Sequence, residues 1–275
     1  MQSDLKMKHL TLLLAGILAG FSLSAQRSIE VGAIGGTTYY IGEMNSFLPF
    51  LYSKPAYGGV YRYNYSDRLA FRLHAFKGEL KGDDSFWPSN QWRGLNFNST
   101  LIEAGGQFEV NFYDFFIGSK RDFWTPYIFG GVSYFYFKPY GNVQGSLVEL
   151  RTLGTEGQNS GVKRSYFYNQ VSIPFGMGIK LSLNKLFGLG FEWGMRKTFT
   201  DYLDDVSGKY YLNLQGSTTA TLDQLASDPA LNHNAGMQRG NPGDKDWYAF
   251  AAVSLVVKIK MLRKEKCLDH QREGY

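Results

Sequence analysis

The sequence has a single cysteine, Cys267, so no disulfide can form within one chain. Its four histidines are scattered, and none stands at a spacing typical of a zinc site or a catalytic triad. No run of about twenty apolar residues follows the first two dozen positions, which excludes a helical membrane protein. The net charge of +5 comes without an aromatic and basic nucleic-acid motif, so we expect no nucleic-acid partner.

Aromatic residues and glycine are abundant instead. The chain has 19 Tyr, 21 Phe and 32 Gly, while only 19% of its residues are charged. Aromatic side chains form belts at the two membrane interfaces of a β-barrel, and small residues fit its narrow interior. The composition therefore favours a membrane barrel over a soluble enzyme.

The N-terminal segment has the pattern of an export signal. Lys6 and Lys8 precede an apolar run from Leu10 to Leu23, and small residues lead to Ala25. We predict cleavage after Ala25; Gln26 at the next position argues against a lipoprotein. A retained membrane anchor is the alternative, but the apolar run is short for one.

Period-two alternation of apolar and polar residues predicts about eight strands. Between Thr100 and Tyr113, Ile102 and Phe108 fall on one face while Glu103 and Glu109 fall on the other. A transmembrane strand needs about nine to eleven such residues, with the apolar face toward lipid. Equally clear alternation covers residues 68–79, 171–182, 187–196 and 247–260, and weaker alternation covers residues 29–39, 55–65 and 125–140.

The connections alternate in length along the chain. Short ones surround residues 66–67, 115–124 and 184–185, and long polar ones cover residues 40–54, 81–98, 141–169 and 201–246. This parity predicts an all-β, antiparallel transmembrane barrel in the outer membrane, with short periplasmic turns and long extracellular loops. We expect a signal peptide over residues 1–25, the barrel over 26–261 and a basic periplasmic tail over 262–275. A soluble β-sandwich is the alternative, but its outward apolar band would aggregate in water.

The interior of such a barrel is filled by side chains, so we expect no wide pore. The predicted inward charges have mixed signs, which favours a network of ion pairs; they are Arg62, Arg72, Glu103, Glu109, Lys180, Glu192 and Arg196. Glu103 and Glu109 cannot form a catalytic dyad, because six residues along one strand span about 20 Å. We predict no catalytic, metal or cofactor residue. The adjacent Asp83 and Asp84 are far short of a calcium loop.

Two stretches resemble a known family. The first is Gly32 to Asn45, with Tyr39-Tyr40 and Gly42-Glu43-Met44-Asn45; the second is Pro55 to Asp84, with Gly58-Gly59-Val60-Tyr61-Arg62. They are similar to the PorG component of the type IX secretion system, over the first third of the chain. The resemblance implies a non-enzymatic outer-membrane part of a protein-secretion and gliding-related machine. It also implies contact with a periplasmic ring formed by the PorK lipoprotein and PorN, and no cofactor or small-molecule substrate.

Such contact would fall on the periplasmic turns and the basic tail. The candidate contact residues are Ser66, Asp67, Lys120, Arg121, Asp122, Asn184, Lys185, Arg263, Lys264 and Lys266. The simpler interpretation is that they are only polar turn residues. Two other functions stay open: an adhesin-like or ligand-binding barrel that acts through its extracellular loops, and a lipid-modifying enzyme. The sequence shows no catalytic-triad pattern for a lipid-modifying enzyme, since no serine stands two residues from His74.

Overall fold

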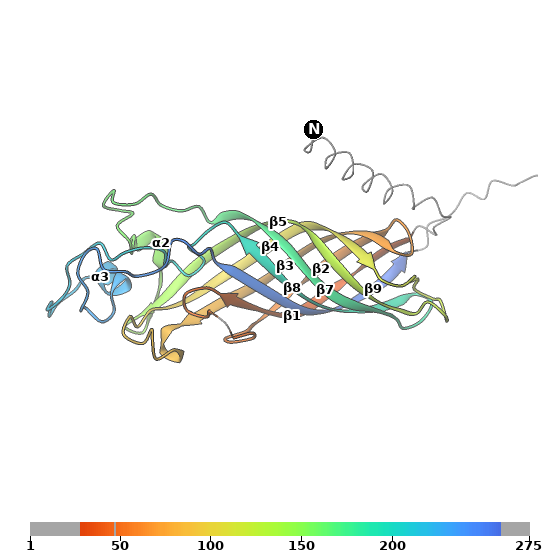
Figure 1. Ribbon diagram of the computed structural model, residues 1–275, viewed down its shortest axis with the longest axis horizontal. Helices are drawn as coiled ribbons and strands as arrows, with labels where there is room; N and C mark the ends of the chain where they lie inside the picture. Colours follow the sequence, from red (N-terminus) through yellow and green to blue (C-terminus); the bar gives the residue numbers. More distant parts are fainter. Residues whose placement is uncertain (1–27, 47, 260–275) are drawn as a thin grey trace, which may run out of the picture.

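The computed structural model describes residues 28–46 and 48–259 of the chain, and Figure 1 shows them as one elongated barrel. The wall consists of β1 (Ser28–Ile41), β2 (Lys54–Asn64), β3 (Leu69–Asp83), β4 (Asn96–Asn111), β5 (Trp124–Val143), β7 (Asn169–Ser182), β8 (Phe187–Thr198) and β9 (Trp247–Ile259). The short strand β6 (Ser146–Glu149) extends β5 as a hairpin. Three short helices lie in the loops: η1 (Asp84–Phe86), α2 (Leu150–Leu153) and α3 (Leu222–Ser227). The predicted signal peptide and tail lie outside the described residues.

The barrel closes because every wall strand pairs with a neighbour on both sides. The sheet runs β4-β3-β2-β1-β9-β8-β7-β5, and the additional pairing of β4 with β5 completes the ring. All of these pairings are antiparallel. Closure leaves no exposed sheet edge, as a bilayer requires. The predicted barrel of about eight antiparallel strands is confirmed.

The outer wall of the barrel is apolar. On β4, Ile102 and Phe108 are 47% and 69% exposed, whereas Glu103 and Glu109, each the next residue along the strand, are fully buried. An apolar band of this extent around a closed wall is stable in lipid and not in water. In the part of the chain that the structure describes, no helix is long and apolar enough to cross a membrane, a finding that does not bear on strands.

The two ends of the barrel differ (Figure 1). The short turns β2–β3, β4–β5 and β7–β8 lie at one end, which we call the turn end. Side chains shape these turns: Ser66 Oγ accepts from the Leu69 amide at 3.0 Å, and Asn184 Oδ1 accepts from the Phe187 amide at 2.9 Å. Aromatic side chains are exposed beside them and form a belt; they include Phe112, Tyr113, Phe123 and Trp124.

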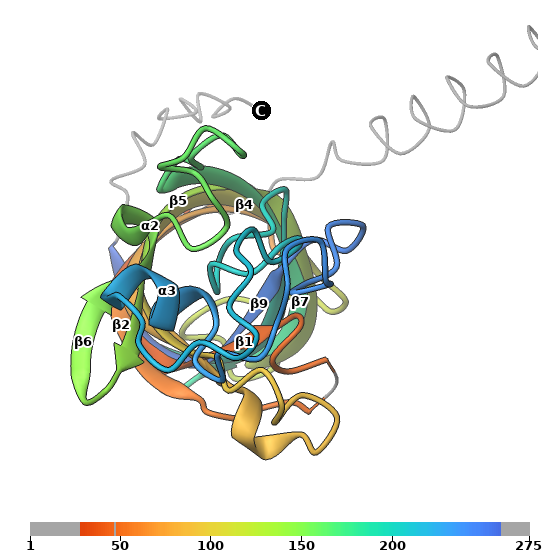
Figure 2. The same ribbon diagram turned by 90° about the vertical axis from the view of Figure 1, so that its left-hand side faces the viewer.

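The long loops gather at the opposite end, together with α2 and α3. Seen from that end, they lie across the mouth of the barrel (Figure 2). We call this part, residues 42–46, 48–53, 84–95, 144–168 and 199–246, the loop cap. Beneath it the interior is aromatic: Phe76 stacks on Phe250 with ring centroids 4.4 Å apart, and Phe135 meets Tyr248 edge to face.

Candidate functional site

Glu109 is the centre of the polar interior near the turn end. Its carboxylate lies 2.8 Å from Arg62 Nε, 3.2 Å from Arg72 Nε and 2.6 Å from Lys180 Nζ. Arg62 also bonds Glu30 at 2.7 Å, and Arg72 pairs with Glu192. Pairing across strands in register explains the cluster, since Glu30 stands opposite Arg62 and Arg62 opposite Arg72.

Glu103 is the centre of a second group, closer to the loop cap. His74 Nε2 lies 2.7 Å and Arg196 Nε 3.4 Å from its carboxylate, and the Tyr248 hydroxyl donates to it at 2.6 Å. The Arg196 guanidinium packs 5.2 Å from the Phe250 ring centroid. The structure thus brings together all seven interior charges named from the sequence.

The interior ion pairs balance in charge. Four cations, Arg62, Arg72, Lys180 and Arg196, stand against four carboxylates, Glu30, Glu103, Glu109 and Glu192. All eight side chains are buried. Mutual neutralisation makes such charges tolerable inside a membrane barrel, and their packed side chains occupy the interior. The arrangement supports a filled tube.

The longest turn closes the turn end. Between β4 and β5, Phe115 and Ile117 fold inward and are buried. The Ile117 carbonyl accepts a hydrogen bond from Lys258 Nζ, and the Gly118 amide donates to Ser182 Oγ at 2.8 Å. These contacts tie the β4–β5 turn to β7 and β9, so this turn is a fixed plug.

The candidate contact residues within the described chain all lie at the turn end. Lys120, Arg121 and Lys185 are exposed. Asp67 is partly buried, and this burial, with the nearby carboxylates of Asp114 and Asp122, raises its pKa. Ser66, Asp122 and Asn184 have side-chain bonds within their own turns. Arg263, Lys264 and Lys266 lie outside the described residues.

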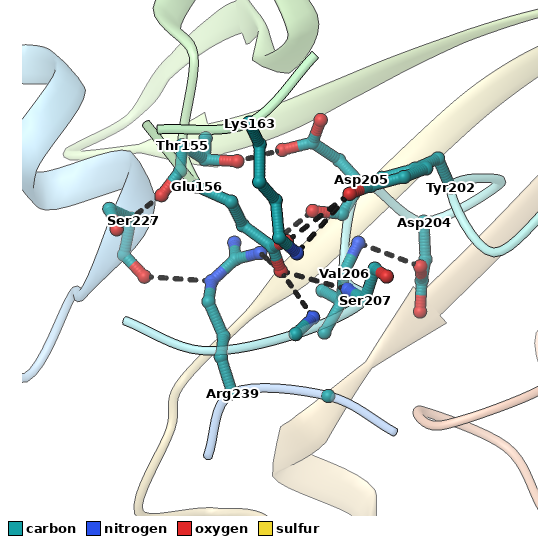
Figure 3. Close-up of polar contacts among 12 residues, drawn as sticks. Thr155, Glu156, Lys163, Tyr202, Asp204, Asp205, Val206, Ser207, Ser227 and Arg239 are labelled. Atoms are coloured by element: carbon teal, nitrogen blue, oxygen red, sulfur yellow. Dashed lines mark hydrogen bonds and ion pairs between the residues drawn. The ribbon is translucent and has the colours of Figure 1, made fainter. Parts of the chain in front are cut away.

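A buried pair of charges joins the loops of the cap (Figure 3). Glu156 Oε1 accepts from the Ser207 and Gly208 amides at 2.8 and 2.9 Å and from Arg239 Nη1 at 3.1 Å. Lys163 Nζ contacts its other oxygen. Burial alone would raise the pKa of Glu156, but Arg239 and these donors hold it below its usual value. Glu156 therefore stays ionised and holds the β6–β7 and β8–β9 loops together.

A second pair fastens the β3–β4 loop to the same hub. Arg93 Nη2 and Nε donate to the Asp84 carboxylate at 2.6 and 2.9 Å, and Arg93 Nη1 donates to the Arg239 carbonyl at 2.7 Å. Asp83 accepts from the Ser85 amide and caps η1. The adjacent acids Asp83 and Asp84 thus have structural partners within the β3–β4 loop.

A cavity of about 540 Å³ opens between the loops of the cap. Its lining includes Glu43, Asn90, Trp92, Lys245 and Asp246, so it is polar and mixed in charge. Burial and the carboxylate of Asp246 raise the pKa of Glu43 to about 8. Glu43, Lys245 and Asp246 could not be recognised as cavity residues from the sequence alone, although Glu43 stands in one of the stretches that carry the family resemblance.

Solved structures of small barrels resemble this fold. Ail, the attachment invasion locus protein of Yersinia pestis, is 7% identical, with a TM-score of 0.39 over 86% of this chain and 100% of that one. Neisserial surface protein A is 10% identical, with a TM-score of 0.41 over 84% and 97% of the two chains. The outer membrane protein OprG from Pseudomonas aeruginosa is 11% identical, with a TM-score of 0.38 over 86% and 97%.

No curated protein matches the sequence. A family model described as a domain of unknown function, DUF6089, matches residues 8–218, which is well over half of the chain. The chain therefore belongs to the DUF6089 family.

Proposed function

We propose that this protein is a non-enzymatic outer-membrane component of a type IX secretion machine, which docks a periplasmic ring of PorK-like and PorN-like proteins. The observation that carries the proposal is the closed turn end, a fixed plug that presents Lys120, Arg121 and Lys185 to the surroundings. The short turns of membrane barrels of this class face the periplasm. The resemblance of the first third of the chain to the PorG component supports the choice of partner.

The filled interior supports a scaffold over a channel. Eight buried charges in balanced pairs occupy the tube, so secreted proteins cannot pass through it. An outer-membrane barrel without a pore can serve a secretion machine by fixing other components at the membrane. The exposed cations then steer an acidic partner surface toward the turn end, an interaction that weakens with salt.

Co-purification of the ring from gently solubilised membranes tests this proposal. Reversing charge at the turn end, with Lys120→Glu and Arg121→Glu, should release the ring and reduce secretion. A matched control reverses two exposed cations of the loop cap, with Arg164→Glu and Lys209→Glu, and should retain both. Recovery of the barrel alone from wild-type membranes, with normal secretion after gene deletion, would overturn the proposal.

The cavity in the loop cap favours a second candidate function, a ligand-binding or adhesin-like barrel. Its 540 Å³ volume is within the range of small-molecule sites, and Trp92 at its wall is 47% exposed. Under this alternative, Trp92→Ala abolishes adhesion of cells to a surface while secretion is unchanged. Under the same alternative, cells with the turn-end variants would adhere and secrete proteins as the wild type does.

A further inference from the structure

Four carboxylates meet where the loop cap joins the barrel. Glu43 comes from the β1–β2 loop, Asp201 and Asp204 follow β8, and Asp246 directly precedes β9. Glu43, Asp201 and Asp246 each place an oxygen within 4.8 Å of the other two. The Tyr40 hydroxyl joins the fourth, since it lies 2.7 Å from Asp204 Oδ2 and 2.6 Å from Asp246 Oδ1.

No cation of the described chain forms an ion pair with this group, although Lys163 and Lys245 lie near enough to act on Asp201 through space. The nearby cations have other carboxylate partners: Arg93 pairs with Asp84, and Lys163 and Arg239 pair with Glu156. Lys245, also at the cavity, donates to the Pro242 carbonyl at 3.0 Å. Buried carboxylates without an opposite charge are costly, and either a bound proton or a metal ion relieves the cost.

Asp201 gives independent evidence for a missing partner. Its side chain is buried, with the residue only 2% exposed, and neither carboxylate oxygen has a hydrogen bond of normal geometry; the Ser207 side chain is a nearby polar neighbour. One of these oxygens is directed at the group, because it lies within 4.8 Å of both the Glu43 and the Asp246 oxygens. A buried, unsatisfied acceptor in a native fold requires an explanation, and an ion bound at this point supplies one.

We propose that Glu43, Asp201 and Asp246 bind a divalent cation of the calcium class. Two oxygens that bind one calcium ion at about 2.4 Å are at most about 4.8 Å apart, and the three oxygens lie within that limit of one another. Magnesium demands near-octahedral geometry and gives up its water ligands reluctantly, whereas calcium accepts an irregular group of protein oxygens. Zinc and copper favour nitrogen or sulfur donors, and this group offers oxygen alone.

The surroundings suit a bound ion. Backbone amides orient two of the ligands: Asn241 donates to Glu43 Oε1 and Leu203 to Asp246 Oδ2, both at 2.9 Å. Gly42 leaves the necessary room, because a Cβ there would lie 1.9 Å from the Tyr40 hydroxyl and 2.5 Å from Asp246 Oδ1. Glu43 and Asp246 also line the 540 Å³ cavity, which provides an entry path and space for coordinating water.

The ion would fasten the β1–β2 loop to both ends of the β8–β9 loop. Its site is at the opposite end of the barrel from the proposed ring contacts, so the two proposals stand independently. Extracellular loops meet calcium at high concentration, and sites of modest affinity are filled there. Calcium then orders the cap that contains the cavity.

Titration of the detergent-purified full-length protein tests the site, after treatment with a chelator. We expect calcium, and much less magnesium, to raise the melting temperature of the cap by several degrees in a saturable way. Terbium should bind in place of calcium and luminesce on excitation of Tyr40 and Trp247. Asp201→Asn should weaken calcium binding by at least about tenfold, and Glu43→Gln is a second variant should the first fold poorly.

Asp244→Asn is the matched control, because Asp244 lines the same cavity but lies outside the three ligands. It should leave the calcium dependence unchanged. A wild-type melting temperature that does not respond to calcium would overturn the site. So would a response that is the same in the wild type, Asp201→Asn and Glu43→Gln, since the ion would then bind elsewhere.

Discussion

Removing the Glu109 charge is the sharpest test of the interior ion pairs. In Glu109→Gln, three buried cations lose a shared carboxylate that lies 2.6–3.2 Å away. Arg62 keeps Glu30 and Arg72 keeps Glu192. Lys180 keeps a hydrogen bond to Asn111 Oδ1 and the Tyr127 ring, 4.5 Å away, but no carboxylate within ion-pair distance among the described residues. The interior would then contain one unbalanced positive charge.

Breaking a buried ion pair on one side costs about 3–5 kcal/mol, because the remaining charge stays desolvated. We expect a loss of this size in the free energy of unfolding of Glu109→Gln, measured with guanidinium in lipid vesicles by tryptophan fluorescence. Asp114→Asn is the control. It breaks an exposed ion pair with Arg68, also 2.6 Å long, and exposed pairs contribute little to the free energy of unfolding.

A second variant separates charge balance from packing. Adding Lys180→Met to Glu109→Gln removes the cation that lost its only carboxylate partner in the described chain, at similar side-chain volume. The double variant should regain part of the lost stability. The reasoning is refuted if Glu109→Gln is no less stable than Asp114→Asn, or if the two interior substitutions simply add.

Three further outcomes follow from the same structure. The purified protein should show no stable conductance in a planar bilayer, and regular channel openings would contradict a filled interior. Glu156→Gln should make the loop cap sensitive to trypsin at neutral pH while the strands stay protected. In the wild type, the lowered pKa of Glu156 stabilises the cap above the unfolded value near 4.5. This contribution is lost as the pH falls through the folded value. Cleavage of the cap by pepsin, which is active in acid, should therefore increase as the pH falls, and Glu156→Gln should flatten this pH profile. Arg93→Ala should release the β3–β4 loop at a local cost of about 3–5 kcal/mol, because it leaves Asp84 buried and unpaired, and unchanged hydrogen exchange in residues 84–95 would contradict this.

The strands and their inward charges could be predicted because the orientation of a side chain in a barrel wall depends on its position in its own strand. Alternation alone decides which side chains meet lipid, so Arg72, Glu103 and Glu109 could be placed from their own strands. Glu30 was missed, since Gly32 and the Gly35-Gly36 pair weaken the alternation of β1. Its role depends on register, which sets it opposite Arg62.

The loop cap could not be predicted in the same way, because its contacts join distant parts of the chain. Glu43 and Asn241 are 198 residues apart, and Glu156 and Arg239 are 83 apart. No periodicity governs such loops, so acids within them resemble ordinary solvated residues. Asp201 and Asp246 frame the longest loop and become neighbours only because β8 and β9 are paired.

The two buried polar regions of this protein solve the same electrostatic problem differently. In the interior, each carboxylate has an arginine, lysine or histidine of the chain within bonding distance, and the charges balance. Where the cap joins the barrel, Glu43, Asp204 and Asp246 have amide or hydroxyl donors, and none of these three or Asp201 forms an ion pair among the described residues. The interior shows that this fold can pair a buried carboxylate with a lysine or arginine side chain. The positive charge that is absent there therefore argues for an ion taken from the medium, whereas the balanced interior argues for a tube that admits none.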